Sequence, residues 1–177
     1  AERFASTGDL EGAPAAAGSH LYVGTLDGQV NAFAAYGPDR GETMWSTEIP
    51  GELKGAMTAH GEVVYAVSRA GHVTALDHEN GAEQWQFSTE GGVARSVALY
   101  CKRAHQTKFG RCRAGDPSEG RDATESVMVT DQTGRAYAVD ADDGTEQWRT
   151  QLDGPLTAPV VAGETVLGGR ERGRLYA

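Results

Sequence analysis

Two cysteines, Cys101 and Cys112, bracket a basic segment and carry the most reactive side chains of this sequence. A disulfide between them would close the segment into a loop and would indicate an oxidising compartment. Two free thiols are a second interpretation. A zinc ion bound by Cys101, His105 and Cys112 is a third, but three ligands at this spacing lack an obvious fourth. The sequence leaves these three chemistries open.

The segment between the cysteines is positively charged, whereas the chain as a whole is acidic, with 16 Lys and Arg against 25 Asp and Glu and a formal net charge of −9. The basic residues of this segment are Lys102, Arg103, Lys108, Arg111 and Arg113. They lie in or beside the polar stretch 102–124, which we expect to be a surface loop. Such a loop could bind an anionic group or an acidic partner, or could simply be solvated. The overall acidity argues against nucleic acid as a partner.

Elsewhere the residue types that perform catalysis lack the spacing that catalysis requires. The histidines, which show no paired metal-ligand spacing, are His20, His60, His72, His78 and His105. No G-x-S-x-G nucleophile context and no G-x-x-x-x-G-K-[ST] phosphate loop is present in the sequence. Asp27 and Asp131 fall in expected hairpin turns, where turn chemistry accounts for them. We therefore predict no catalytic residues and, apart from the zinc alternative at Cys101, His105 and Cys112, no metal site.

The elements that position these side chains are internal repeats. Residues 75–85, ALDHENGAEQW, return as residues 138–148, AVDADDGTEQW. Four glycines each precede an alanine by the same interval, and they are Gly28, Gly71, Gly134 and Gly173. The distance from Trp45 to Trp85 gives a period of about 40 residues, which indicates copies of one supersecondary unit.

Each copy alternates with period two, which is typical of strands, and no stretch favours a helix of three turns. The copies begin with a small apolar strand, continue with a hairpin around the marker glycine, and end with a strand that carries tryptophan. The sequence therefore predicts an all-β fold, a β-propeller of four-stranded antiparallel blades with about four blades in this chain.

The recurring residues suit distinct structural tasks. Asp77 and Asp140 can cap their own turns, and Gly81 and Gly144 can adopt positive φ. The tryptophan then falls on the next strand beside a small residue, Ala75 or Ala138. We interpret the three tryptophans as groups that dock one blade on the next; they are Trp45, Trp85 and Trp148. Stacking platforms for a ligand are the alternative interpretation.

The pattern A-x-D-x-x-x-G-x-x-x-W, at 75–85 and 138–148, resembles the tryptophan-docking motif of the pyrroloquinoline-quinone-like (PQQ-like) propeller repeats. The resemblance covers nearly the whole chain outside residues 102–124. Proteins with these repeats include quinoprotein alcohol dehydrogenases, the propeller lipoprotein of the outer-membrane β-barrel assembly machinery, and many sensors and scaffolds. The first copy departs from the motif, because Ala34 replaces the aspartate and its turn is longer.

We predict a single domain over residues 1–177. Its repeats cover approximately 8–49, 50–90, 91–152 with the insertion 102–124, and 153–177 completed by 1–7, where Phe4 takes the place of a tryptophan. Three arrangements are open: a closed four-bladed ring, half of an eight-bladed ring completed by a homodimer, or part of a longer seven- or eight-bladed propeller. The family usually has more than four blades, which favours the last two.

The resemblance implies a calcium ion and a stacked quinone in the dehydrogenases of the family, usually with adjacent cysteines, and no residue set here matches that site. We therefore expect a non-catalytic scaffold without a cofactor that binds a protein or peptide. We also expect it to be extracytoplasmic, periplasmic or at the cell surface, without a transmembrane segment in this chain. The alternatives are a fragment of a PQQ-dependent quinoprotein dehydrogenase, with PQQ and calcium, or the extracytoplasmic sensor domain of a membrane kinase.

Overall fold

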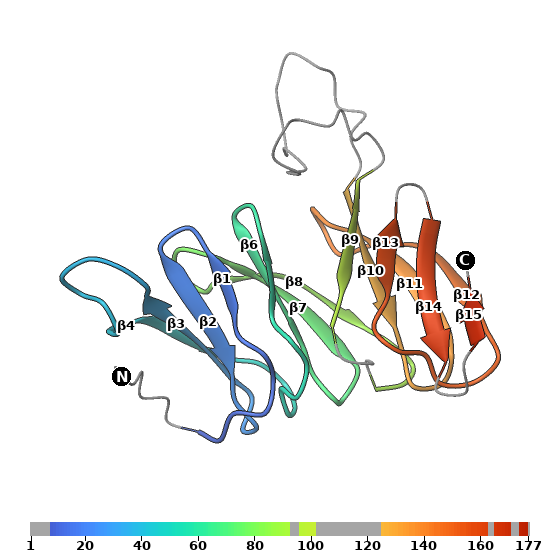
Figure 1. Cartoon of the computed structure of the whole chain (residues 1–177), viewed down its shortest axis with the longest axis horizontal. Coiled ribbons are helices and arrows are strands. Elements are labelled where there is room, and N and C mark those ends of the chain that lie inside the picture. The colour runs from blue at the N-terminus through green and yellow to red at the C-terminus, as the bar shows by residue number, and fades with distance from the viewer. Residues whose placement is uncertain (1–7, 93–95, 102–124, 163–164, 171–173, 177) are drawn as a thin grey trace, which may run out of the picture.

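Antiparallel sheets stand side by side along an arc in the computed structural model of the chain (Figure 1). The structure describes residues 8–92, 96–101, 125–162, 165–170 and 174–176. Three sheets have four strands and one has three, each in the chain order of its strands. The part of the chain that the structure describes contains no helix. The predicted all-β propeller is therefore confirmed.

We number the sheets in chain order. The strands of sheet 1 are β1 (Ala15–Ala17), β2 (His20–Gly24), β3 (Gln29–Ala34) and β4 (Thr43–Glu48). Those of sheet 2 are β5 (Thr58–His60), β6 (Val63–Val67), β7 (His72–Asp77) and β8 (Glu83–Ser88). Those of sheet 3 are β9 (Ala98–Cys101), β10 (Glu125–Thr130), β11 (Arg135–Asp140) and β12 (Glu146–Gln151). Sheet 4 has β13 (Val160–Ala162), β14 (Thr165–Arg170) and β15 (Arg174–Tyr176).

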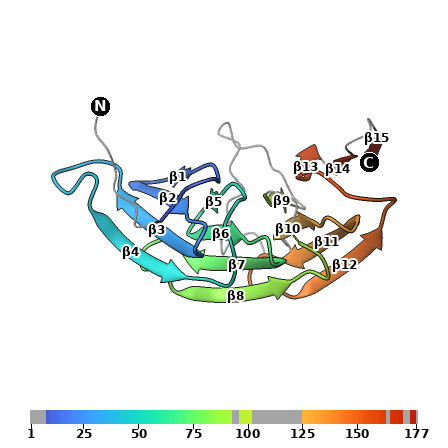
Figure 2. The same cartoon turned by 90° about the horizontal axis from the view of Figure 1, so that it is seen from below.

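Short strands line the inside of the arc and long ones its outside. Figure 2 shows β1, β5, β9 and β13 on the concave side, and β4, β8 and β12 along the convex side. The inner strands carry small residues such as Ala15, Ala17 and Ala59, which pack against the core between sheets 1 and 2. Small side chains let the sheets crowd together on the concave side, so they favour this position.

The core lies between neighbouring sheets rather than within one sheet. One cluster joins sheets 1 and 2 around Tyr22, Trp45 and Val64. A second joins sheets 2 and 3 around Tyr65, Trp85 and Val127. Because a blade buries its apolar surface only against its neighbour, the stability of the arc depends on these junctions.

The repeat boundaries remain a prediction, and the proposed contribution of residues 1–7 to the fourth blade lies outside the described residues. Within the described residues, no helix is long and apolar enough to cross a membrane.

Candidate interaction surface

The junction between sheets 1 and 2 shows how a tryptophan docks. The indole Nε1 of Trp45 donates a hydrogen bond of 3.0 Å to the carbonyl oxygen of His78, in the turn after β7. The ring lies against Gly81, so closely that a Cβ on this glycine would be 2.7 Å from Trp45 Cδ2. Thr47 donates to the Gly81 carbonyl at 2.7 Å. The turn thus contacts the indole in two ways: a carbonyl oxygen accepts its N–H, and a glycine without a side chain lets the ring lie against the backbone.

The junction between sheets 2 and 3 repeats this geometry. Trp85 Nε1 donates to the carbonyl oxygen of Ala141 at 2.9 Å. A Cβ on Gly144 would lie 2.8 Å from Trp85 Cδ2 and Cε3. Trp45 and Trp85 are only 8% and 6% exposed, so each indole is removed from water by the next sheet.

The residues of the repeated motif shape these receiving turns. The Asp77 carboxylate accepts hydrogen bonds from the amides of Glu79 and Asn80, and the Asp140 carboxylate accepts one from the amide of Asp142. Gly81 and Gly144 have φ values of +71° and +75°, a region that favours glycine. The small residues Ala75 and Ala138 lie opposite Trp85 and Trp148 in the strand registers.

The corresponding turn of sheet 1, between β3 and β4, is closed by the same backbone hydrogen bond although its sequence differs. The amide of Gly41 donates to the carbonyl of Ala34 at 2.9 Å, as the amide of Gly81 does to Asp77 and that of Gly144 to Asp140. Gly41 has a φ of +90°. The extra residues and the missing aspartate therefore change the turn without changing how it returns to β4.

Trp148 differs from the other two tryptophans in its surroundings. It stands opposite Ala138, with the same register shift that follows Ala32 and Ala75. Its side chain is nevertheless 42% exposed, and the other residues of β12 are exposed as well. In the part of the chain that the structure describes, no turn reaches this indole. Its role in blade docking stays a prediction.

A titratable pair bridges sheets 2 and 3 between β5 and β10. His60 Nε2 at the end of β5 lies 3.2 Å from Glu125 Oε1 at the start of β10, but the two are not aligned for a hydrogen bond. Burial raises the pKa of the Glu125 carboxyl, His60 opposes that rise, and Asp142 adds to it. Burial also raises the pKa of the nearby Tyr65 hydroxyl, to which Glu125 and Asp142 contribute. The spacing of the histidines in the sequence does not indicate this partner.

This pair predicts a pH-dependent stability. Because the folded-state pKa of Glu125 is raised above its ordinary 4.5, its contribution is fully present below that value and is lost as the pH rises through the folded pKa. We expect Glu125→Gln to gain melting temperature relative to the unmodified chain above pH 6, and the gain to shrink towards pH 4. Melting curves between pH 4 and pH 8 check this. A constant offset across that range would contradict it.

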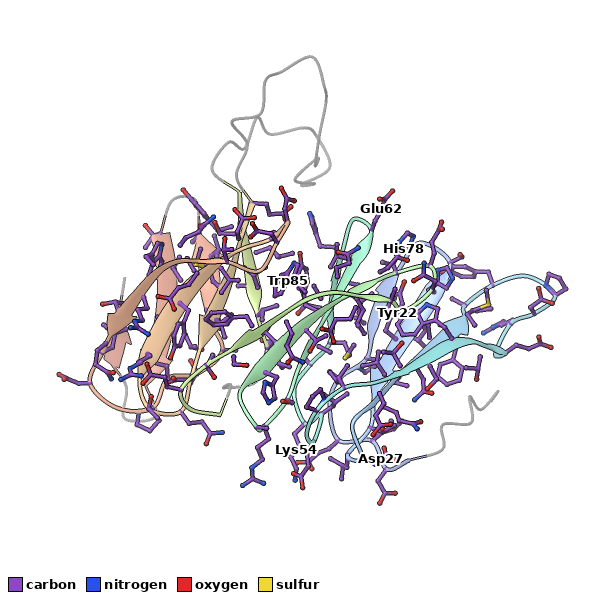
Figure 3. All side chains as sticks on the ribbon, turned by 180° about the vertical axis from the view of Figure 1, so that it is seen from behind. Tyr22, Asp27, Lys54, Glu62, His78 and Trp85 are labelled. Atoms are coloured by element: carbon purple, nitrogen blue, oxygen red, sulfur yellow. The ribbon has the colours of Figure 1, made fainter. Side chains whose placement is uncertain are left out.

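Other histidines lie on the same side of the molecule. His20 and His78 meet edge to face, with ring centroids 6.0 Å apart, and Tyr22 stacks on His20. Figure 3 shows Glu62 and His78 at one end of the strands and Asp27 and Lys54 at the other, with Tyr22 and Trp85 between. Nowhere in the described residues do three or more His, Cys, Asp or Glu side chains form a group that could hold a metal ion.

At the opposite end of the strands, polar side chains in the hairpin turns accept hydrogen bonds from backbone amides of the same turns. Asp131, fully buried, accepts hydrogen bonds from the amides of Thr133 and Arg135 and from the hydroxyl of Tyr137 at 3.0 Å. Ser68 has the corresponding role for the amide of His72, and Asp27 accepts a short hydrogen bond from Thr25. Turn structure therefore accounts for Asp27 and Asp131, as the sequence suggested.

Tyr137 links this cap to the segment between sheets 2 and 3, because its hydroxyl also accepts a hydrogen bond from the amide of Glu90 at 3.3 Å. Removing the hydroxyl in Tyr137→Phe leaves a buried carboxylate oxygen and an amide without this partner. We expect a loss of about 1–2 kcal/mol in the free energy of unfolding, measured by urea denaturation. Tyr100→Phe, on β9, is the control and should cost less.

The basic segment that follows Cys101 lies outside the described residues. Cys101 ends β9, and Cys112 lies outside the described residues, as do Lys102, Arg103, His105, Lys108, Arg111 and Arg113. The disulfide, thiol and zinc interpretations therefore stay predictions.

Sheet 4 has three strands among the described residues, so β15 has no partner on its outer side among the described strands. By the repeat, β15 holds the position of β7 and β11, which pair with β8 and β12. The turn that would receive Trp148 follows β15 in the repeat and lies outside the described residues.

The antiparallel sheets are arranged radially, and the Asp-x-x-x-Gly turn of one sheet docks the tryptophan of the sheet before it. These features define a β-propeller of the PQQ-like repeat class. The sequence profile of the family described as "Outer membrane protein assembly factor BamB" matches residues 3–125 and 104–177, and the chain belongs to this family.

Individual relatives include proteins of two kinds. BamB from Salmonella typhimurium (strain LT2) is 31% identical over 129 residues, which are 68% of this chain and 29% of the relative. Polyvinylalcohol dehydrogenase from Sphingopyxis sp. (strain 113P3) is 28% identical over 109 residues, 62% of this chain and 14% of the relative. The crystal structure of BamB from Moraxella catarrhalis superposes with a TM-score of 0.65 at 21% identity, covering 96% of this chain and 48% of that one. The chain thus spans less than half of these relatives.

Proposed function

We propose that this chain is a non-catalytic propeller scaffold that binds a protein or peptide outside the cytoplasm. The observation that carries the proposal is the match of the assembly-factor family profile to residues 3–125 and 104–177. Trp45, Trp85 and the buried Asp131 are occupied in docking and turn capping. Strand addition at a sheet edge would give the binding its backbone hydrogen bonds.

The BamB relatives support this proposal, because they are described as outer membrane protein assembly factors. Such a task requires binding polypeptide, and it supports a location in the periplasm or at the outer membrane. No nucleic acid is expected as a partner of a chain with a net charge of −9. A homodimer that completes a ring is compatible with the incomplete sheet 4 and forms part of the test.

The polyvinylalcohol dehydrogenase relatives favour a second candidate, a part of a quinoprotein dehydrogenase with PQQ and calcium. Under this candidate the chain would supply blades to a larger propeller, and the residues that hold the cofactor would be supplied elsewhere. The described residues offer no carboxylate cluster for calcium.

The test compares the two candidates on the purified chain. A urea-denatured outer-membrane β-barrel protein, diluted into buffer with the chain, should form a complex, and the backbone amides of the sheet edge that it pairs with should gain protection from hydrogen exchange. Light scattering on a sizing column reports the mass of the free chain and of the complex. Absence of a complex, together with saturable binding of PQQ and Ca²⁺ and dye-linked oxidation of poly(vinyl alcohol), would replace the scaffold proposal with the dehydrogenase candidate.

A further inference from the structure

The repeat places a glutamate at the same position of sheets 2 and 3, but only one of the two is buried. Glu62 and Glu125 each stand three residues before the strand position that lies opposite the motif alanine. Glu62 is exposed, whereas the Glu125 side chain is only 17% exposed. Glu125 shares a face of β10 with Val127, which is buried in the cluster between sheets 2 and 3. The carboxylate that meets water at one junction is therefore enclosed at the next.

A histidine accompanies the buried glutamate and is missing beside the exposed one. The residue that ends the inner strand of the preceding sheet is Ala17 in sheet 1 and His60 in sheet 2. His60 Nε2 lies 3.2 Å from Glu125 Oε1, and neither of these buried atoms has a hydrogen-bond partner among the described residues. An imidazolium at this distance compensates a buried carboxylate, whereas a neutral imidazole leaves the charge unpaired.

The other titratable groups around the pair do not supply a cation. Burial raises the pKa of the Glu125 carboxyl, His60 opposes the rise, and Asp142 in the turn after β11 adds to it. Tyr65 on β6 is a phenol whose own pKa is raised by burial, so it stays neutral. β1, which also contacts β5, consists of alanines, and β9 places Cys101 opposite Glu125 in the strand register. Among the described side chains, His60 is thus the cation that can compensate Glu125.

We infer that His60 and Glu125 form a proton-controlled joint between sheets 2 and 3. When the imidazole is protonated, the pair holds β5 against β10. When the imidazole is neutral and the carboxylate is ionised, a buried charge lacks its partner and the joint loosens. Histidine is the side chain whose charge ordinarily changes near neutral pH, so the joint should close under mildly acidic conditions. The inference goes beyond the proposed function, because it does not depend on what the chain binds.

The joint lies at the base of the insertion. β9 ends at Cys101 and β10 begins at Glu125, so residues 102–124 connect two strand ends that are paired beside His60. The same junction contains the indole of Trp85, which donates to the carbonyl of Ala141. The proton on His60 therefore acts on the two strands that flank the basic segment and on the junction that encloses Trp85.

Hydrogen exchange of the indole N–H groups tests the joint. Trp85 and Trp45 make equivalent hydrogen bonds in neighbouring junctions, and their exchange can be followed separately by nitrogen-15 NMR of the full chain. The ratio of the Trp85 protection to the Trp45 protection cancels the intrinsic pH dependence of indole exchange. In the unmodified chain this ratio should rise at least about fivefold between pH 7.5 and pH 5.5.

Two variants assign the response to the pair. Glu125→Gln removes the buried charge, so Trp85 should be at least about threefold better protected at pH 7.5 than in the unmodified chain, and the response to pH should fall below about twofold. His60→Gln removes the cation, so Trp85 should be at least about threefold less protected at pH 5.5. His72→Gln is the matched control, since His72 lies in the same sheet and contacts Ser88 instead, and it should leave the response unchanged.

A second measurement reads the coupling directly. The carboxyl carbon of Glu125 is titrated by carbon-13 NMR, and in His60→Gln its pKa should rise further, because His60 opposes the rise in the unmodified chain. An equal pH response in the unmodified chain and in Glu125→Gln would overturn the inference, and so would a Glu125 titration that is unchanged by His60→Gln. Neither result affects the complex with denatured β-barrel protein, so the proposed function is tested separately.

Discussion

Replacing Trp85 with alanine is expected to lower the free energy of unfolding by about 3–5 kcal/mol. The side chain is 6% exposed and fills the space between sheets 2 and 3 beside Tyr65, at a ring-centroid distance of 5.9 Å. Its loss leaves a cavity between the two sheets, and it leaves the carbonyl of Ala141 without its donor. Urea denaturation followed by circular dichroism measures the change.

Trp148→Ala is the matched control, because both tryptophans end the same motif and lie opposite an alanine. With 42% of its side chain exposed, Trp148 should cost about 1 kcal/mol or less. Trp85→Phe keeps an aromatic ring at the buried site and removes the indole donor together with part of the ring, so it should cost less than Trp85→Ala but at least about 1–2 kcal/mol. Equal losses for Trp85→Ala and Trp148→Ala would show that position in the motif, and not docking on the next sheet, sets the contribution.

The repeat made much of this fold predictable, because each unit's requirements are local. The alternation around Gly71 and Gly134 is sufficient to specify a hairpin, and the aspartate cap and positive-φ glycine act within a few residues of each other. The size complementarity of alanine and tryptophan on adjacent strands could also be inferred from the spacing. These features depend on chain connectivity and not on the packing of one sheet on another.

Contacts between sheets could not be predicted in the same way. The pairing of His60 with Glu125 joins residues on either side of the insertion 102–124, so no fixed offset in the sequence marks it. The carbonyl acceptors of His78 and Ala141 are backbone groups, which no residue type signals. The exposure of Trp148 depends on what covers it, and a motif that follows the same pattern as a buried one carries no information about that.

Replacing Gly81 with alanine should be nearly as damaging as losing a tryptophan, with an expected loss of about 3–4 kcal/mol. Two costs combine. The residue has a φ of +71°, which a side chain disfavours by about 1–2 kcal/mol. The added Cβ also meets the ring of Trp45, at 2.7 Å from Cδ2, and the hydroxyl of Thr47. Neither neighbour can retreat easily, since both are hydrogen-bonded across the junction to the turn itself.

Gly61→Ala isolates the backbone cost. This glycine has a similar φ of +58°, yet nothing lies within 4 Å of a Cβ placed on it. Its replacement should therefore cost only the strain, about 1–2 kcal/mol. The difference between the two alanine variants measures the contact with Trp45 and Thr47. If the two variants lose the same stability, the indole does not rest on the glycine, and the docking geometry is wrong.

A double-mutant cycle then assigns the contact to one partner. In a Trp45→Ala background the ring that meets the new Cβ is gone, so Gly81→Ala should cost at least about 1 kcal/mol less than it does alone. Gly61→Ala in the same background should cost what it does in the unmodified chain, because its site has no contact with the indole. A coupling confined to Gly81 would mean that the bare Cα of the receiving turn is what the tryptophan recognises.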